Sequence, residues 1–223
     1  MTHQPWHKRI SSEPLKLAVL VSGGGRTLVN LMEKIQLGEL NAQVVKVIAS
    51  NASSQSKLAQ RGVAQSVEVA SRKAFDSTQA FSDHIFAQCR EAGAELVCLA
   101  GFLSLLRIPE DFALRVVNIH PALLPAFGGQ GMYGHHVHEA VIEHGCKVSG
   151  CTVHFADNTY DTGPILVQRT CEVLPDDDAD ALAARVFEQE CIAYPQAIAL
   201  LEAGRVEVID NRRTHVHAAG RGR

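Results

Sequence analysis

The sequence has little that would place it in a membrane, on nucleic acid or in an oxidising compartment. None of its hydrophobic runs approaches the ~18 apolar residues that suggest a membrane span, and Met1–Pro14 lacks the apolar stretch of a secretory signal. The net charge is only −3, and no basic stripe with interleaved aromatic residues is present. The six cysteines include no Cys-x-x-Cys pair and are expected to be reduced. These absences predict a cytoplasmic protein that acts on small molecules.

The distribution of apolar residues predicts one α/β domain. Short runs rich in β-branched residues alternate with longer amphipathic runs, which is typical of parallel strands joined by helical crossovers. The expected strands are Leu17–Val21, Val44–Ala49, Leu96–Ala100, Arg115–Ile119, Gly150–Phe155 and Ile165–Thr170. The expected helices are Thr27–Gln36, Ser77–Glu91, His136–His144 and Ala179–Glu202. Together they predict an open, mostly parallel, twisted sheet of about seven strands, with helices on both faces and a Rossmann-like N-terminal half.

The two ends of the chain are expected to differ from this domain. No internal repeat or long linker interrupts residues 15–205, so the domain is assigned to that range. Residues 1–14 are polar, and residues 212–223 are basic and glycine-rich, so both segments are expected to be poorly ordered. The aspartates at 176–178 are expected to cap and charge the start of the last helix.

A glycine-rich turn follows the first expected strand and leads into a helix. The segment reads Ser22-Gly23-Gly24-Gly25-Arg26-Thr27-Leu28. Glycines let backbone N–H groups approach a ligand, and the N-terminus of the helix carries unpaired donors and the positive end of the helix dipole. We therefore expect a phosphate group to bind here, assisted by the charge of Arg26 and the hydroxyl of Thr27. A tight turn that binds nothing is the alternative.

Two other phosphate-binding motifs do not fit this turn. A dinucleotide-binding Gly-x-Gly-x-x-Gly pattern would need a glycine at Leu28, and an acidic residue where Ser50 and Asn51 follow the second strand. A P-loop would need Gly-Lys-Ser/Thr after a longer loop. The sequence therefore favours a monophosphate on a small substrate.

Two polar residues stand where another expected strand, Arg115–Ile119, ends. Asn118 and His120 are two residues apart, so they lie on the same face of the strand. The carboxyl ends of strands are where open α/β sheets bind ligands. Asn118 can donate a hydrogen bond to an oxygen that gains charge, and His120 can carry a proton near neutral pH. A strand-end histidine beside a turn-forming asparagine, without catalytic function, is the alternative.

Two loops are expected to border this position. Residues 122–134 form a long, glycine-rich segment of the kind that serves as a lid or binding loop. The histidines at 135, 136 and 138 follow it, but no further residues have the spacing of metal ligands, so no metal is expected. The second loop follows the expected strand Gly150–Phe155 and carries Asp157 and Asp161. If it folds back over the strand that ends at Asn118 and His120, Asp161 would stabilise protonated His120 and raise its pKa. Asp157 is the competing carboxylate, and turn capping is the alternative for both.

Taken together, these segments resemble a known enzyme family. Its motifs are similar to Ser22–Leu28, Ala100–Phe102, Asn118-Ile-His-Pro-Ala-Leu-Leu-Pro125 and Asp161-Thr-Gly-Pro164 of this chain. The family is the phosphoribosylglycinamide formyltransferases of purine biosynthesis, and the resemblance spans residues 16–205. It implies transfer of a formyl group from 10-formyltetrahydrofolate, the co-substrate, to the amine of glycinamide ribonucleotide. It implies neither nucleic acid nor membrane as a partner, and it leaves the oligomeric state open, with a homodimer as one option.

The resemblance also implies functions for individual residues. Asn118 and His120 would bind and polarise the formyl oxygen, and Asp161 would raise the pKa of His120. Gly25, Arg26 and Thr27 match the segment that holds the ribonucleotide phosphate, beside Gly23 and Gly24 of the same turn, and Glu190 matches a residue that touches the ribonucleotide. The implied folate contacts are Leu103, Ser104, Leu105, Leu106, Asn118 and Asp157. His138 and His154 also stand where the family has histidine.

Several positions depart from the family pattern. Arg26 and Thr27 replace a neutral pair, and Ser104 and Thr78 stand where arginine is common. The loop Phe127–Gly134 is also longer than usual. These departures leave two alternatives open: a related formyltransferase that acts on a nucleotide-linked amino sugar, or a non-catalytic nucleotide-binding domain. A nicotinamide oxidoreductase is disfavoured by Leu28.

Overall fold

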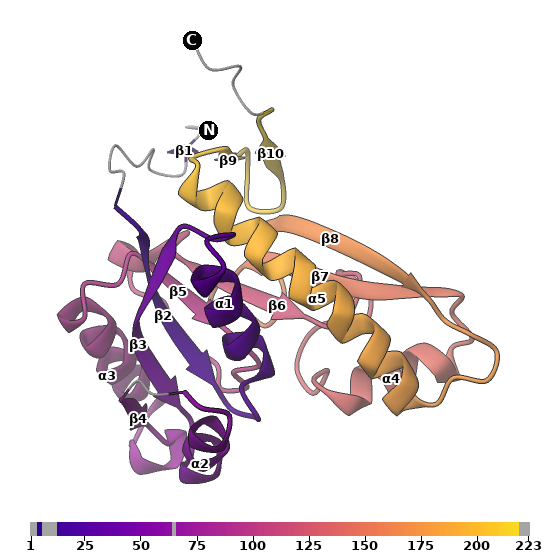
Figure 1. Cartoon of the computed structure of the whole chain (residues 1–223), viewed down its shortest axis with the longest axis horizontal. Helices are drawn as coiled ribbons and strands as arrows, with labels where there is room; N and C mark the ends of the chain where they lie inside the picture. The colour runs from indigo at the N-terminus through magenta and orange to yellow at the C-terminus, as the bar shows by residue number, and fades with distance from the viewer. Residues whose placement is uncertain (1–3, 6–12, 64–65, 219–223) are drawn as a thin grey trace.

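A seven-stranded sheet organises the protein (Figure 1). The computed structural model describes residues 4–5, 13–63 and 66–218. In spatial order the strands are β4 (Val67–Val69), β3 (Ala42–Ala49), β2 (Leu15–Val21), β5 (Leu96–Leu99), β6 (Val116–His120), β7 (Val148–Phe155) and β8 (Ile165–Glu172). Strands β4 to β6 pair in parallel, whereas β7 and β8 are antiparallel to their neighbours. The predicted α/β class and mostly parallel sheet are confirmed.

Helices cover both faces of this sheet. They are α1 (Arg26–Gln36), α2 (Ala52–Gln60), α3 (Thr78–Glu91), α4 (His135–Glu143) and α5 (Ala179–Glu202), with short 3₁₀ turns η1 (Arg72–Ala74) and η2 (Glu110–Phe112). Along β2, Leu17 and Val19 belong to the hydrophobic core that includes α1 and α5, whereas Ala18 and Leu20 belong to the core that includes α3. Successive residues of a strand face opposite sides of the sheet, so a buried apolar strand packs into the cores on both faces. Figure 1 shows α1 and α5 across the same face.

Helix α5 is fixed at its start and in its middle. The Asp178 carboxylate accepts a hydrogen bond from the backbone N–H of Ala181 at 2.8 Å, which is the predicted cap. In the middle of α5, the buried Tyr194 hydroxyl lies 3.1 Å from the carbonyl oxygens of both Leu99 and Val117. The Tyr194 contacts attach α5 to the carboxyl end of β5 and to the first part of β6.

Some elements were not predicted, including short strands near the two ends of the chain. The predictions omitted α2, β4 and the 3₁₀ turns. A second sheet pairs β9 (Val206–Val208) with β1 (Gln4–Pro5) and β10 (Thr214–Val216). Parts of both segments that were expected to be poorly ordered therefore form strands, because Val206 and Val208 provide a buried strand on which they pair. Residues 1–3, 6–12 and 219–223 lie outside the described residues.

Two further predictions concern the cysteines and the compartment. All six cysteines are free thiols, as predicted. Among the described segments, no helix has both the length and the apolar character needed to cross a membrane. Cytoplasmic location and a homodimer stay predictions.

Candidate active site

The carboxyl ends of β2, β5 and β6 open into one cavity of about 830 Å³. A volume of this size is typical of small-molecule sites. Segments far apart in the sequence line it: the glycine turn after β2, the loop after β5, the end of β6, the lid loop and α5. Every predicted site residue lies in its wall: Gly23, Gly24, Gly25, Arg26, Thr27, Leu103, Ser104, Leu105, Leu106, Asn118, His120, Asp157, Asp161 and Glu190. The structure thus brings together residues that the sequence assigned to separate subsites.

The glycine turn leaves the N-terminus of α1 open towards this cavity. Gly25 is the N-cap residue with φ 70°, and no side-chain cap bonds to the helix. A Cβ atom at Gly25 would lie 2.1 Å from Cδ2 of the buried Leu58, so a larger residue does not fit. The Ser22 hydroxyl accepts a hydrogen bond from the backbone N–H of Leu103 at 3.1 Å, which joins this turn to the loop after β5. The turn therefore presents backbone donors and a positive helix end to a ligand.

Arg26 and Glu190 both line the cavity and are close enough to interact electrostatically. The Arg26 guanidinium carbon lies 4.0 Å from the centre of the Phe187 ring on α5, which holds the side chain in a cation–π contact. Burial raises the pKa of the Glu190 carboxyl to about 7, although the charge of Arg26 acts in the opposite direction. Glu190 can therefore donate or accept a hydrogen bond near neutral pH.

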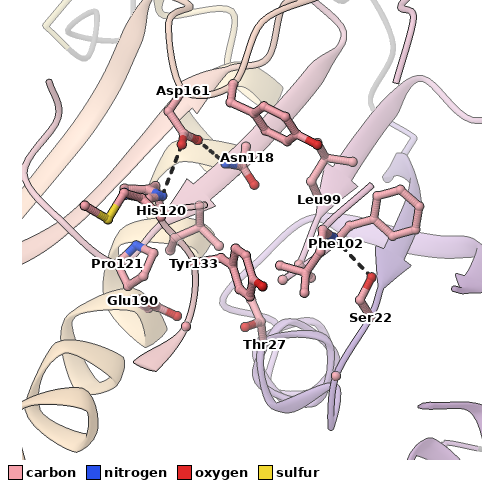
Figure 2. A pocket seen from close by; sticks show the side chains of 18 of the residues that line it. Ser22, Thr27, Leu99, Phe102, Asn118, His120, Pro121, Tyr133, Asp161 and Glu190 are labelled. Carbon is pink, nitrogen blue, oxygen red and sulfur yellow. Dashed lines mark hydrogen bonds and ion pairs between the residues drawn. The ribbon is translucent and has the colours of Figure 1, made fainter. Parts of the chain in front are cut away.

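Asn118, His120 and Asp161 converge at the end of β6 (Figure 2). The Asn118 Nδ2 atom lies 3.4 Å from Asp161 Oδ1, and His120 Nδ1 lies 3.6 Å from Asp161 Oδ2. The other ring nitrogen of His120, Nε2, lies 2.8 Å from the carbonyl oxygen of Phe127. Because a carbonyl only accepts hydrogen bonds, Nε2 carries a proton. The loop after β7 therefore folds back over β6, as the hypothesis for Asp161 required.

The electrostatic balance in this group differs from the expectation for His120. Burial lowers the pKa of His120 by more than Asp161 and the Phe127 carbonyl raise it, so its pKa lies below the ordinary value. The predicted net rise is therefore wrong, although the contribution of Asp161 has the expected sign. Burial also pushes the pKa of Asp161 upwards, but His154, His120 and the Gly129 N–H together outweigh it and lower the pKa. At neutral pH Asp161 is an anion beside a neutral His120.

Asp157 does not take the place of Asp161 beside the histidine. Its carboxylate accepts hydrogen bonds from the backbone N–H of Thr159 at 2.8 Å and from the Thr162 hydroxyl at 2.8 Å. These contacts close the loop that carries Asp161, whose own backbone is left-handed with φ 57°. Asp157 thus shapes the loop and lines the cavity, and Asp161 is the carboxylate near His120.

The lid loop Phe127–Gly134 is attached to the same group. The Gly129 N–H donates to Asp161 Oδ2 at 2.9 Å, while Phe127 contacts His120 through its carbonyl. A Cβ atom at Gly128 would lie 2.5 Å from Leu124 Cδ2 and 3.3 Å from Asp161 Cβ, so glycine permits this close approach. The lid therefore borders the cavity, as predicted, and fixes both members of the His120–Asp161 pair.

Several lining residues were missed by sequence reasoning. Phe187 had the ordinary appearance of a helix-core aromatic residue, with no signal that it lines a cavity, and Tyr133 was expected only as part of the lid loop. His154 was noted only as a position shared with the resembling family. Its place opposite Asn118 follows from the β6–β7 register, which the hydrophobic pattern alone does not specify. Within the described residues, no three His, Cys, Asp or Glu side chains are grouped so as to hold a metal.

The fold is that of a defined class of protein. Residues 15–198 match the family model described as formyl transferase, so the chain belongs to the formyl transferase family. It is therefore a formyl-transferring enzyme.

Particular relatives share most of this chain. It is 35% identical over 209 residues to the chloroplastic phosphoribosylglycinamide formyltransferase of Arabidopsis thaliana, covering 92% of this chain and 69% of the relative. It is 37% identical over 203 residues to the trifunctional purine biosynthetic protein adenosine-3 of Drosophila melanogaster, covering 88% of this chain but only 14% of that longer protein. The crystal structure of glycinamide ribonucleotide transformylase 1 from Symbiobacterium toebii superposes with a TM-score of 0.84 and 33% identity, covering 93% of this chain and 96% of that one.

Proposed function

We propose that this enzyme transfers the formyl group of 10-formyltetrahydrofolate to the amine of glycinamide ribonucleotide, a step of de novo purine biosynthesis. The observation that carries the proposal is the shared cavity, which joins the open N-terminus of α1 to Asn118, His120 and Asp161. The names of the relatives support glycinamide ribonucleotide as the acceptor of the formyl group. The folate is a co-substrate, and the proposal requires no metal.

The ribonucleotide is assigned to the end of the cavity between α1 and α5. Its phosphate would accept hydrogen bonds from the backbone of Gly23–Thr27 and from the Arg26 guanidinium, which the Phe187 ring holds in place. Glu190, with a pKa near neutrality, would bond to a hydroxyl of the ribose. The folate is assigned to the wall formed by Leu103–Leu106 and Asp157.

The reacting groups meet beside Asn118, His120 and Asp161. The neutral amine attacks the formyl carbon, a new C–N bond forms, and the formyl oxygen gains negative charge. Asn118 Nδ2 stabilises that oxygen, and so does His120 once the proton released by the amine has converted its ring to imidazolium. The amine then gives up a proton, the folate N10 gains one, and the bond between N10 and the formyl carbon breaks. The anionic Asp161 lies where it can accept the proton that the amine loses.

The test is turnover with purified protein, glycinamide ribonucleotide and 10-formyltetrahydrofolate, followed by the absorbance of the folate product. Turnover that depends on both substrates is expected, and the Asn118→Ala variant controls for contaminating activity. A nucleotide-linked amino sugar is tested in parallel as the acceptor. Preference for the amino sugar would overturn the assigned acceptor, and binding of the ribonucleotide without turnover would overturn the assigned activity.

A further inference from the structure

His154 has no function in the reaction described above, yet it lies against two of the reacting groups. It is 1% exposed and stands on β7 directly opposite Asn118 of β6. Its Nε2 atom is 3.1 Å from Asn118 Nδ2 and 3.5 Å from Asp161 Oδ1. We infer that His154 is a positioning residue, which orients the Asn118 amide so that its N–H group faces the oxygen that gains charge. This inference rests on the proposed function.

The backbone fixes which nitrogen of His154 carries a proton. Nδ1 lies 2.8 Å from the carbonyl oxygen of Phe155. A carbonyl oxygen only accepts hydrogen bonds, so Nδ1 carries a proton, and in the ring that holds only this proton Nε2 is unprotonated. Nε2 is then a hydrogen-bond acceptor. The 3.1 Å contact with Asn118 is therefore a bond donated by the Asn118 amide to the His154 ring.

This bond fixes the orientation of the Asn118 side-chain amide, which could otherwise flip and exchange the positions of Oδ1 and Nδ2. In the observed orientation, one N–H of Nδ2 bonds to His154 and the other is directed towards Asp161 Oδ1 at 3.4 Å. In the opposite orientation, Asn118 Oδ1 would face both the unprotonated Nε2 atom and the Asp161 carboxylate. Three acceptors would then meet without a proton between them, which is unfavourable in a buried site.

The second N–H of Asn118 is the one available to the substrate. Its 3.4 Å contact with Asp161 is long for a hydrogen bond, so little is lost when a substrate oxygen replaces that contact. The first N–H stays with His154 throughout. The amide is thus preorganised before the oxygen gains charge, which is the condition under which such a donor accelerates a reaction.

Three substitutions separate this positioning function from simple packing. In His154→Gln, Oε1 can occupy the place of Nε2 and accept from Asn118. In His154→Asn, the shorter side chain can still donate to the Phe155 carbonyl but leaves no acceptor near Asn118. Ser149→Ala is the matched control, because Ser149 is a buried polar residue of β7 that does not line the cavity. Each protein is characterised by kcat, by KM for both substrates and by thermal unfolding.

We expect His154→Asn to lower kcat by roughly 10- to 100-fold, because misorientation costs part of the ~10²–10³-fold effect of an oxyanion donor. Both KM values should change little, His154→Gln should recover most of kcat, and Ser149→Ala should keep the parent kcat. In an Asn118→Ala background, His154→Asn should cause no further loss. Equal losses in the Gln and Asn variants, or additive losses with Asn118→Ala, would overturn the inference.

One measurement on the unaltered protein needs neither a variant nor turnover. Long-range ¹H–¹⁵N spectra assign the protonated nitrogen of each histidine ring. Protonation of His154 at Nδ1 alone, at the pH of the assay, supports the inference, and protonation at Nε2 contradicts it. Absence of turnover in the unaltered protein would instead count against the proposed function, so the two failures are distinguishable.

Discussion

Gly25 is the position in the glycine turn after β2 where the structure predicts the largest effect of a single methyl group. In Gly25→Ala, the new Cβ would lie 2.1 Å from Leu58 Cδ2 and 3.3 Å from Leu58 Cγ, in a backbone with φ 70°. Gly23→Ala is the matched control in the same turn, because a Cβ there meets no atom within 4 Å. The left-handed backbone costs an alanine about 1–2 kcal/mol. Overpacking against a fully buried leucine adds about 1–3 kcal/mol.

Gly25→Ala should therefore destabilise the protein by roughly 3 kcal/mol, equivalent to a fall in Tm of roughly 6–12 °C for a chain of this size. Gly23→Ala should change the free energy of unfolding by less than about 0.5 kcal/mol. Thermal unfolding of both variants measures the difference. The Gly25→Ala/Leu58→Ala double variant tests the cause, because removal of the leucine side chain relieves the clash. Equal Tm values for the two glycine variants, or strict additivity in the double variant, would refute the argument.

Three other substitutions probe the site. Arg26→Met should raise KM for the phosphorylated amine about 10-fold or more, since a hydrogen bond to a charged group contributes about 1.5–3 kcal/mol; an equal rise in KM for the folate would contradict a phosphate contact. Asn118→Ala should lower kcat by ~10²–10³-fold in single-turnover kinetics, and an unchanged rate would remove it from the oxyanion site. His138 is 4% exposed, and burial lowers its pKa from 6.5 to about 4. The folded state thus binds this proton less readily than the unfolded state, so stability declines as pH falls from about 6.5 to about 4, by about 3 kcal/mol. Between pH 7 and pH 4, the free energy of unfolding measured with urea should fall in the parent protein by about 3 kcal/mol more than in His138→Leu. Equal falls in the parent protein and the variant would contradict this prediction.

Elements with a strong hydrophobic period could be predicted from the sequence, and those without one could not. The buried strands β2, β3 and β5 were expected close to their observed bounds because their residues are apolar on both faces. Helix α2 reads Ala-Ser-Ser-Gln-Ser-Lys-Leu-Ala-Gln and buries only Ser54 and Leu58, so it has no apolar stripe to detect. Strand β4 has three residues, which is too short for an alternating pattern.

The same distinction applies to the site. Asn118 and His120 could be placed because the carboxyl ends of parallel strands meet at one edge of the sheet. Asp161 could be placed only conditionally, because its position depends on a loop closed by Asp157 and on a left-handed backbone at a non-glycine residue. The contact of Arg26 with Phe187 joins residues of two helices, and no local pattern encodes it. The positions of side chains at the ends of strands could therefore be predicted from the sequence. The closure of the loop and the contacts between helices could be seen only in the structure.

The protonation states give the His120–Asp161 pair a definite order of action under the proposed function. The pKa of His120 is lowered, so the resting ring is neutral at neutral pH and is not a standing acid. Its Nε2 proton is engaged by the Phe127 carbonyl, and its basic Nδ1 atom faces the Asp161 anion at 3.6 Å. A proton released by the attacking amine can be held between these two atoms, where it converts the ring to imidazolium as the formyl oxygen gains charge. The pair thus accepts a proton first and donates one second, so the positive charge forms when the reaction needs it and the buried site does not have to hold that charge at rest.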